Sequence, residues 1–356
     1  MKYLSLFFIG ILFVTLFPLQ SFANDDILFL RAKVLEIQEE GTGEFGNYQK
    51  LRVELLDPPY RGKVAEIEAG DVFEQSASHN FLPGETLIVR KMGDEFVFSE
   101  RYRLPAVFFV TLCFLLLALL LTKKRGFFAL FGLVVSFLVI LFILIPALQK
   151  GTSPLLAGIF SCILIASISL FLAHGFRKTT IIALISTIAT LSIAGILSEL
   201  SVAITHLFGV GSEEAFQIQL MGGFSGEFRG LLLAGILIGT LGVLDDITTT
   251  QVAIVEELKK VNTALTSKEL FQRGSNIGNE HLLSMLNTLV LAYTGASLPL
   301  FLLFFSGAMP VWAILNSEIL SEEIIRTLVG STAILIGIPL TNALAAFWYG
   351  KEKNIA

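Results

Sequence analysis

Long apolar runs dominate the chain after residue 104, and short polar connections separate them. Seven such runs follow in order, at 105–122, 127–146, 154–173, 180–205, 230–250, 282–305 and 325–348. Each is close to the twenty or so residues that a helix needs to cross the hydrocarbon layer of a bilayer. We therefore predict a polytopic α-helical membrane domain with about seven transmembrane helices over residues 105–350.

The pattern is different in residues 24–104, where apolar and polar residues alternate in short stretches such as LFLRAKVLEI and ETLIVRK. Turn compositions, among them LDPPYRG and MGD, separate these stretches. Alternation with a period of two is typical of strands with one buried face. We predict about five strands that form a small β-rich domain of the OB-like or SH3-like kind.

The first residues have the pattern of a signal peptide, which we assign to residues 1–23. Lys2 precedes an apolar core, Pro18 breaks it, and small residues at Ser21 and Ala23 fit a cleavage site. The alternative is an uncleaved first helix that anchors the chain. Either reading sends the β-rich domain across the membrane, so we expect it to be extracytoplasmic.

Basic residues are concentrated in alternate connections between the apolar runs. The connections on the predicted cytoplasmic side contain most of them: Lys123, Lys124, Arg125, Arg177, Lys178, Lys259, Lys260, Lys268, Arg273, Lys351 and Lys353. Cytoplasmic loops of membrane proteins carry such an excess. This distribution predicts a cytoplasmic tail at 351–356 and agrees independently with the signal peptide.

The connection before the sixth run is amphipathic and has its own helix signals. Ile254, Leu258, Val261 and Leu265 share one helical stripe, and TSKE at 266–269 matches a capping box. We predict a cytoplasmic amphipathic segment at 250–280 within the membrane domain.

Composition agrees with this picture and excludes several classes of protein. Of the 356 residues, 54% are hydrophobic and only 15% charged, with a mean hydropathy of +0.76, which rules out a soluble enzyme. The net charge of −5 is spread along the chain and gives no basic stripe for nucleic acid. Cys113 and Cys162 lie in apolar runs, as packed thiols do, and the four histidines lack metal-ligand spacing. We predict no catalytic, metal or cofactor site.

The run GTLGVLDDITTT places two adjacent aspartates, Asp245 and Asp246, at the end of the fifth apolar run. Carboxylates beside hydrocarbon are costly unless they are paired, hydrated or neutralised. The helix-packing candidates Gly235, Gly239 and Gly242 share a helical face with Asp246, whereas Asp245 is rotated about 100° away. We expect Asp246 to lie along a close-packed seam and Asp245 to face a neighbouring side or headgroups.

Two readings of this acidic pair remain open beside a role in transport. The pair could cap a cytoplasmic helix or make structural contacts, since Asp and Thr are good N-caps, or it could contact a partner.

Polar residues also recur in the last two apolar runs. Asn287, Thr288 and Tyr293 lie in the sixth run, where Gly295 marks a packing or bending point, and Asn342 lies in the seventh. Buried amides often join helices in membranes, so each alone is explained structurally. Their concentration predicts a polar path in helices 5 to 7, with these candidates: Asp246, Asp245, Thr249, Asn287, Thr288, Tyr293 and Asn342.

The runs GTLGVLDDITTTQVAIVEEL, RGSNIGNEHLLSMLNTLVLAYTGASLP and IRTLVGSTAILIGIPLTNALAAF together resemble the YibE/F family of bacterial multi-pass membrane proteins. The resemblance implies a bacterial plasma-membrane protein of transporter-like appearance, and it implies no reaction. Many members have Arg-Asp where this chain has Asn279 and Glu280, so a salt bridge from that arginine to Asp246 is not available here.

Three functions compete on this basis. The first is a permease-like transporter or transport component, and the second is a non-transporting scaffold or assembly factor whose outer β-domain binds a protein partner. The third, an intramembrane enzyme, fits neither the DDxxD pattern of prenyl transfer nor the facing acids of an aspartyl protease. The bilayer is the one partner that we predict firmly, no nucleic acid is expected, and homo- or hetero-oligomers stay open.

Overall fold

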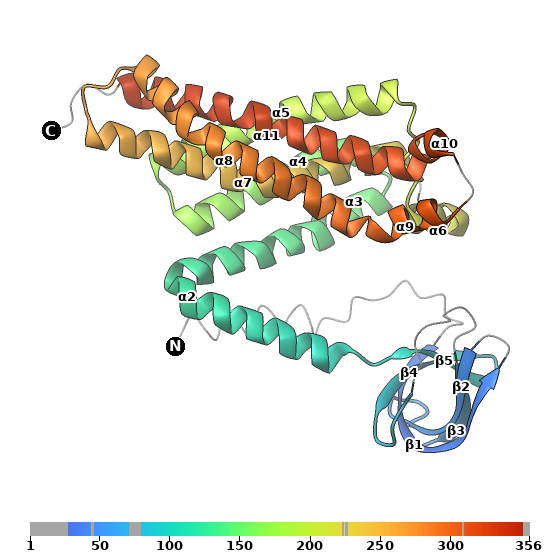
Figure 1. Cartoon of the computed structure of the whole chain (residues 1–356). Helices are drawn as coiled ribbons and strands as arrows, with labels where there is room; N and C mark the ends of the chain where they lie inside the picture. Colours follow the sequence, from blue (N-terminus) through green and yellow to red (C-terminus); the bar gives the residue numbers. More distant parts are fainter. Residues whose placement is uncertain are drawn as a thin grey trace. The chain divides into compact units, whose positions relative to one another are not determined.

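A computed structural model describes residues 28–351 of the chain except 44–45, 71–79, 223, 225–226 and 308–309. It divides into two units, residues 1–123 and residues 124–356, each of which is described by itself (Figure 1). The signal peptide predicted at 1–23 and most of the predicted cytoplasmic tail lie outside the described residues.

The first unit contains an antiparallel half-barrel of five strands. These are β1 (Leu28–Gly43), β2 (Gly46–Leu55), β3 (Val64–Gly70), β4 (Thr86–Met92) and β5 (Glu95–Arg101), in the order β3-β2-β1-β4-β5. Alternate residues such as Leu30, Ala32 and Val34 are buried, as the period-two pattern predicts. The β-rich domain is thereby confirmed, and its assignment to the OB or SH3 type stays a prediction.

One ion pair fixes the connection after β2 to the start of β1. The Arg31 guanidinium donates to both carboxylate oxygens of Asp57, at 2.6 Å from Nη2 to Oδ1, and the Arg31 backbone N–H donates to Oδ2 at 2.7 Å. Hydrogen bonding from the Arg31 side chain holds the pKa of Asp57 below its usual value, against an opposing effect of partial burial.

Long apolar helices follow. The helix α2 (Leu104–Val139) is interrupted at Lys123, where φ is 54°, and its second half continues through the π-helix η1 (Ile140–Leu144) into α3 (Ile145–Gln149). Next come α4 (Pro154–His174), α5 (Lys178–Ile204), α7 (Phe228–Val261) and α11 (Glu318–Lys351). Among the described residues, six helices are long and apolar enough to cross a membrane. The chain is therefore a multi-pass membrane protein.

These six helices correspond to six of the seven predicted runs. The remaining run, 282–305, is divided between α8 (Ser267–Ala296) and α9 (Leu298–Ser306), with Ser297 between them and a proline in the first turn of α9. A break close to Gly295 and Pro299 is thus confirmed. The count of seven membrane crossings stays a prediction.

The second unit is built around three neighbouring helices, α7, α8 and α11 (Figure 1). At one end of the bundle Val255 of α7 clusters with Ala345 of α11, and at the other end Ile236 clusters with Val329. The helices α7 and α11 therefore run in the same direction. Tyr293, near the end of α8, meets Gly239 in the first half of α7, so α8 runs the opposite way.

The predicted amphipathic segment at 250–280 is not a separate helix. Instead α7 continues without a break to Val261, and α8 begins after Thr266 with the predicted capping box, in which Thr266 Oγ1 accepts from the Glu269 N–H at 3.3 Å. Leu265 and Leu270 pack in the same cluster as Ala345 and Val255. The segment is therefore a helical hairpin fixed to the end of the bundle.

The opposite end of the bundle is closed by loops and two short helices, α6 (Glu213–Met221) and α10 (Val311–Leu315). Glu318, at the start of α11, accepts backbone N–H bonds from Phe208 and Gly209 at 2.8 and 3.1 Å. Glu322, only 4% exposed, accepts the N–H of Gly211 at 2.9 Å. These bonds attach the connection after α5 to α11.

Candidate functional site

The two adjacent aspartates lie within α7, about 27 Å along the helix axis from its start at Phe228. The N-cap of α7 is Glu227, and the helix is continuous through Asp245 and Asp246. The alternative in which the pair caps a separate cytoplasmic helix is therefore wrong. Both carboxylates project from the side of a regular helix.

Asp246 and the glycines share a face, as predicted, but that face is open. An ideal Cβ placed on Gly235 or Gly242 would meet no heavy atom within 4 Å outside its own helix segment. Asp246 is exposed on the same side. Only Gly239 has a close neighbour, because a Cβ there would lie 2.7 Å from the Tyr293 hydroxyl oxygen. The expectation that Asp246 lies along a close-packed seam is therefore wrong for the single chain.

The close-packed side of α7 is the adjoining one. A Cβ on Gly158 of α4 would lie 2.8 Å from Cβ of Ala234, and one on Gly230 would lie 3.0 Å from Pro154. The small residues that bring α4 and α7 together are thus Gly158, Ala234 and Gly230. Periodicity alone identified a small-residue face of α7, but it selected the other one.

Asp245 projects toward the α4 side and is the more buried of the two aspartates. Its Oδ1 atom is inaccessible to solvent and has no hydrogen-bond partner, and its charge acts on the buried thiol of Cys162 in α4. The expectation that Asp245 faces headgroups is therefore wrong. Thr249 Oγ1 donates to the backbone carbonyls of Asp245 and Asp246 at 2.8 and 3.2 Å and leaves both carboxylates without a bond from it.

The open face of α7 is bordered on two sides. On one side Ile238 packs against the cluster that contains Val139 of α2 and Cys162. On the other side Val243 packs with Leu289 and Tyr293 of α8. Gly235, Gly239, Gly242 and Asp246 therefore form the floor of a shallow trough, which we call the glycine trough.

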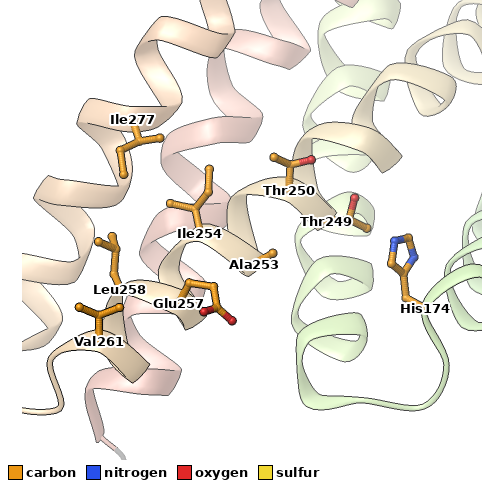
Figure 2. Close-up of a pocket in the computed structure, with 9 residues that line it drawn as sticks. All are labelled: His174, Thr249, Thr250, Ala253, Ile254, Glu257, Leu258, Val261 and Ile277. Atoms are coloured by element: carbon orange, nitrogen blue, oxygen red, sulfur yellow. The ribbon is translucent and has the colours of Figure 1, made fainter.

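The trough continues into a cavity of about 610 Å³ near the other end of α7. Figure 2 shows Thr249 and the ring of His174, from the end of α4, at one side of this cavity, with Ile277 of α8 and Ile254 at the other. The remaining lining residues are Thr250, Ala253, Glu257, Leu258 and Val261. Its walls are largely apolar, with hydroxyl, imidazole and carboxylate groups at the edges.

The polar residues of α8 lie at the surface of the single chain. Asn287 and Thr288 are exposed, and Thr288 Oγ1 donates to the Ser284 carbonyl at 3.0 Å. Gly295 is open, with no heavy atom within 4 Å of an added Cβ. Tyr293 is half-buried against Gly239. The structure therefore brings Tyr293 to the trough and leaves Asn287 and Thr288 on the outer side of α8.

Asn342 belongs to a different, buried polar cluster. Gln251 Nε2 donates to Asn342 Oδ1 and to the Gly274 carbonyl, both at 2.8 Å, and Asn342 Nδ2 donates to Ser275 Oγ at 3.3 Å. Gln251 is 1% exposed and Asn342 is fully buried. This cluster, named here the amide cluster, joins α7, α8 and α11.

Sequence reasoning missed Gln251, although a signal was present. Thr248, Gln251 and Val255 are spaced three and four residues apart, which places them on one face of α7, and all three are buried. The Thr248 hydroxyl bonds to that of Thr187 in α5 at 2.8 Å. A glutamine in register with a buried hydroxyl is typical of an interhelical contact in membranes.

Within the described residues, no group of three or more His, Cys, Asp or Glu side chains is arranged to hold a metal ion. The chemistry that the site offers is therefore electrostatic: one exposed carboxylate, one partly buried carboxylate, and hydroxyl groups along an otherwise apolar trough.

Comparison with known proteins agrees with this architecture at the level of the family. No characterised protein and no solved structure matches the chain. A model of the family described as YibE/F-like protein matches residues 110–351, well over half of the chain and nearly all of the helical part, and leaves the β-domain outside. The chain is therefore a member of the YibE/F-like family.

Proposed function

We propose that this protein is a permease-like transporter, or the membrane component of one, whose path follows the glycine trough with Asp246 as its charged element. One observation carries the proposal, namely an exposed carboxylate beside open glycines in a helix that is long and apolar enough to cross the membrane. Ionisable residues within membrane segments mark ion and substrate pathways because they are otherwise costly.

The depth of Asp246 supports this reading. The helix α7 has 34 residues and is about 50 Å long, whereas the hydrocarbon layer is about 30 Å thick. Asp246, about 27 Å from the start, then lies near one boundary of that layer, where it can receive ions from water and pass them along the trough. A carboxylate attracts cations, so cations are the substrate class that the trough suits best.

The direction of the helices supports seven crossings. Since α7 and α11 run the same way, the chain between them must return across the layer, and α8 runs antiparallel to both. In the proposed topology the β-domain is extracytoplasmic and the hairpin at 250–280 is cytoplasmic. A reporter that is active only in the cytoplasm should then work after Ala356 and fail after Arg103.

A scaffold or assembly factor is the second candidate, and the amide cluster favours it. There every amide of Gln251 and Asn342 that donates does so to another helix, which is the arrangement of a structural joint. In a scaffold, Asp246 would contact a partner protein and conduct nothing.

Flux through the purified protein in liposomes separates the two candidates. Vesicles that contain a pH-sensitive dye are challenged with gradients of H⁺, Na⁺ or K⁺, and the rate is normalised to folded protein. We expect Asp246→Asn, which keeps the volume and removes the charge, to fold normally and to lose at least about tenfold of the flux.

Asp245→Asn is the matched control. Its carboxylate has a buried oxygen without a partner, so removal of the charge should not lower the free energy of unfolding, and flux should fall less than for Asp246→Asn. Equal flux in the parent and Asp246→Asn would contradict the transport proposal. Absence of flux in the parent for all three ions would favour the scaffold.

A further inference from the structure

The basic residues of the β-domain fall into two groups. Arg31, Lys50, Arg52, Arg101 and Arg103 each form an ion pair with a carboxylate of the same domain. Within the described part of the domain, no such pair is formed by these cations: Lys33, Arg61, Lys63, Arg90 and Lys91. Four of these five lie at one end of the strands, because Arg61 and Lys63 precede β3 and Arg90 and Lys91 end β4.

An aromatic pair holds two of the cations in place. The rings of Tyr60 and Phe96 meet edge to face at 5.4 Å between centroids. Lys63 Nζ lies 5.7 Å from the Tyr60 centroid and 5.1 Å from that of Phe96, and Lys91 Nζ lies 5.1 Å from Tyr60. Cation–π attraction therefore positions both ammonium groups at the mouth of the half-barrel, free of a carboxylate partner.

Exposed apolar side chains border these cations. The register pairs Phe29 with Arg90 and Arg90 with Val97, so the three side chains share the outer face of the sheet. Phe29 is 57% exposed, Met92 53% and Val97 38%. We call this set of Phe29, Lys63, Arg90, Lys91, Met92 and Val97 the cationic–apolar patch. The nearest acids in sequence, Asp94 and Glu95 in the β4–β5 turn, balance only part of its charge.

From this arrangement we propose that the cationic–apolar patch binds the surface of a membrane that contains anionic phospholipids. Lysine and arginine beside exposed aromatic and aliphatic groups are the combination that interfacial proteins use, because the cations attract anionic headgroups and the apolar groups enter the acyl boundary. The headgroups occupy the place that carboxylates take around the other basic residues of the domain.

The covalent connection to the membrane part supports lipid as the occupant. The strand β5 ends at Arg101, and α2, the first candidate span, begins at Leu104. Val97 is separated from Tyr102 by a stretch of strand no longer than about 17 Å. The patch is thereby tethered within reach of the bilayer into which α2 inserts, whichever side of the membrane the domain occupies.

The test uses the full chain in nanodiscs and does not require any transport activity. Cys113→Ser and Cys162→Ala remove the native thiols, and Met92→Cys carries an environment-sensitive fluorophore. Glu68→Cys, on an exposed position of β3, provides the matched control label. Discs of phosphatidylcholine alone are compared with discs of phosphatidylcholine and phosphatidylglycerol.

We expect the label at position 92 to shift to the blue, and to be quenched by lipid-attached quenchers, only in discs that contain phosphatidylglycerol. Added salt and the substitutions Lys63→Gln, Arg90→Gln and Lys91→Gln together should abolish this shift, whereas the label at 68 should stay aqueous in both lipids. If the triple variant has an altered melting curve, Lys63→Gln alone should reduce the shift.

Two results would overturn the proposal. One is an equally aqueous label at 92 in the two kinds of disc. The other is a shift that soluble polyglutamate produces and phosphatidylglycerol does not, which would assign the patch to an acidic protein. Neither result bears on Asp246, so the transport proposal is tested separately.

Discussion

The amide cluster and the glycine trough contain polar groups on the same helix, α7, yet only one of them is satisfied within the chain. Gln251 bonds to both α8 and α11 and is buried, whereas Asp246, five residues earlier, is exposed with open glycines beside it. In hydrocarbon an unsatisfied polar group costs several kcal/mol. The comparison teaches that the first set holds helices together and that the second set requires water, an ion or a partner.

The largest expected effect is on packing at the amide cluster. A Cβ on Gly278 would lie 2.8 Å from both Gln251 Oε1 and Ile338 Cγ2, whereas one on Gly242 meets no heavy atom within 4 Å. We expect Gly278→Ala to lower the free energy of unfolding by about 1–3 kcal/mol, because overpacking displaces a bonded side chain. Denaturation by SDS titration in mixed micelles measures this, with Gly242→Ala as the control.

Equal stability of Gly278→Ala and Gly242→Ala would contradict the assignment of close packing to one face and openness to the other. A loss of flux in Gly242→Ala without loss of stability would support the trough as a path.

A smaller effect is expected from the bond between Gln251 and Asn342. A double-mutant cycle with Gln251→Ala and Asn342→Ala should give a coupling energy of about 0.6–1.7 kcal/mol, the range found for hydrogen bonds between membrane helices. The same titration measures it. A coupling near zero would show that the 2.8 Å contact contributes nothing to stability in the membrane.

The smallest effect on stability is expected at Asn287. Its side chain is exposed on α8, so Asn287→Leu should change the free energy of unfolding by less than about 0.5 kcal/mol. If the outer side of α8 faces only lipid, flux also stays unchanged or rises with protein abundance. Reduced flux at unchanged stability would extend the path from the trough to α8.

Local patterns made much of the fold predictable. Alternation identified the strands, the length of the apolar runs identified six helices, and TSKE identified the start of α8 because a capping box depends only on residues within one turn. The buried hydroxyls of α5, such as Ser186, Thr187 and Thr190, also lie inside the bundle as their concentration indicates.

The candidate site was less predictable, for a physical reason. Periodicity states which residues share a helical face, but the identity of the helix that meets that face depends on the whole bundle. Gly235, Gly239 and Gly242 do share a face with Asp246, yet α4 packs on the neighbouring face through Ala234. Asp245 and Asp246 consequently exchange the environments that the sequence suggests.

The continuity of α7 has a mechanical consequence. A helix without proline, bulge or break between Phe228 and Val261 is a stiff rod, so its segment in the membrane and its end in the hairpin turn as one body. Adjacent residues are separated by about 100° around the axis. A rotation of the rod by that angle would carry Asp245 from beside α4 into the trough, and the hairpin at the far end is the handle by which such a torque can be applied.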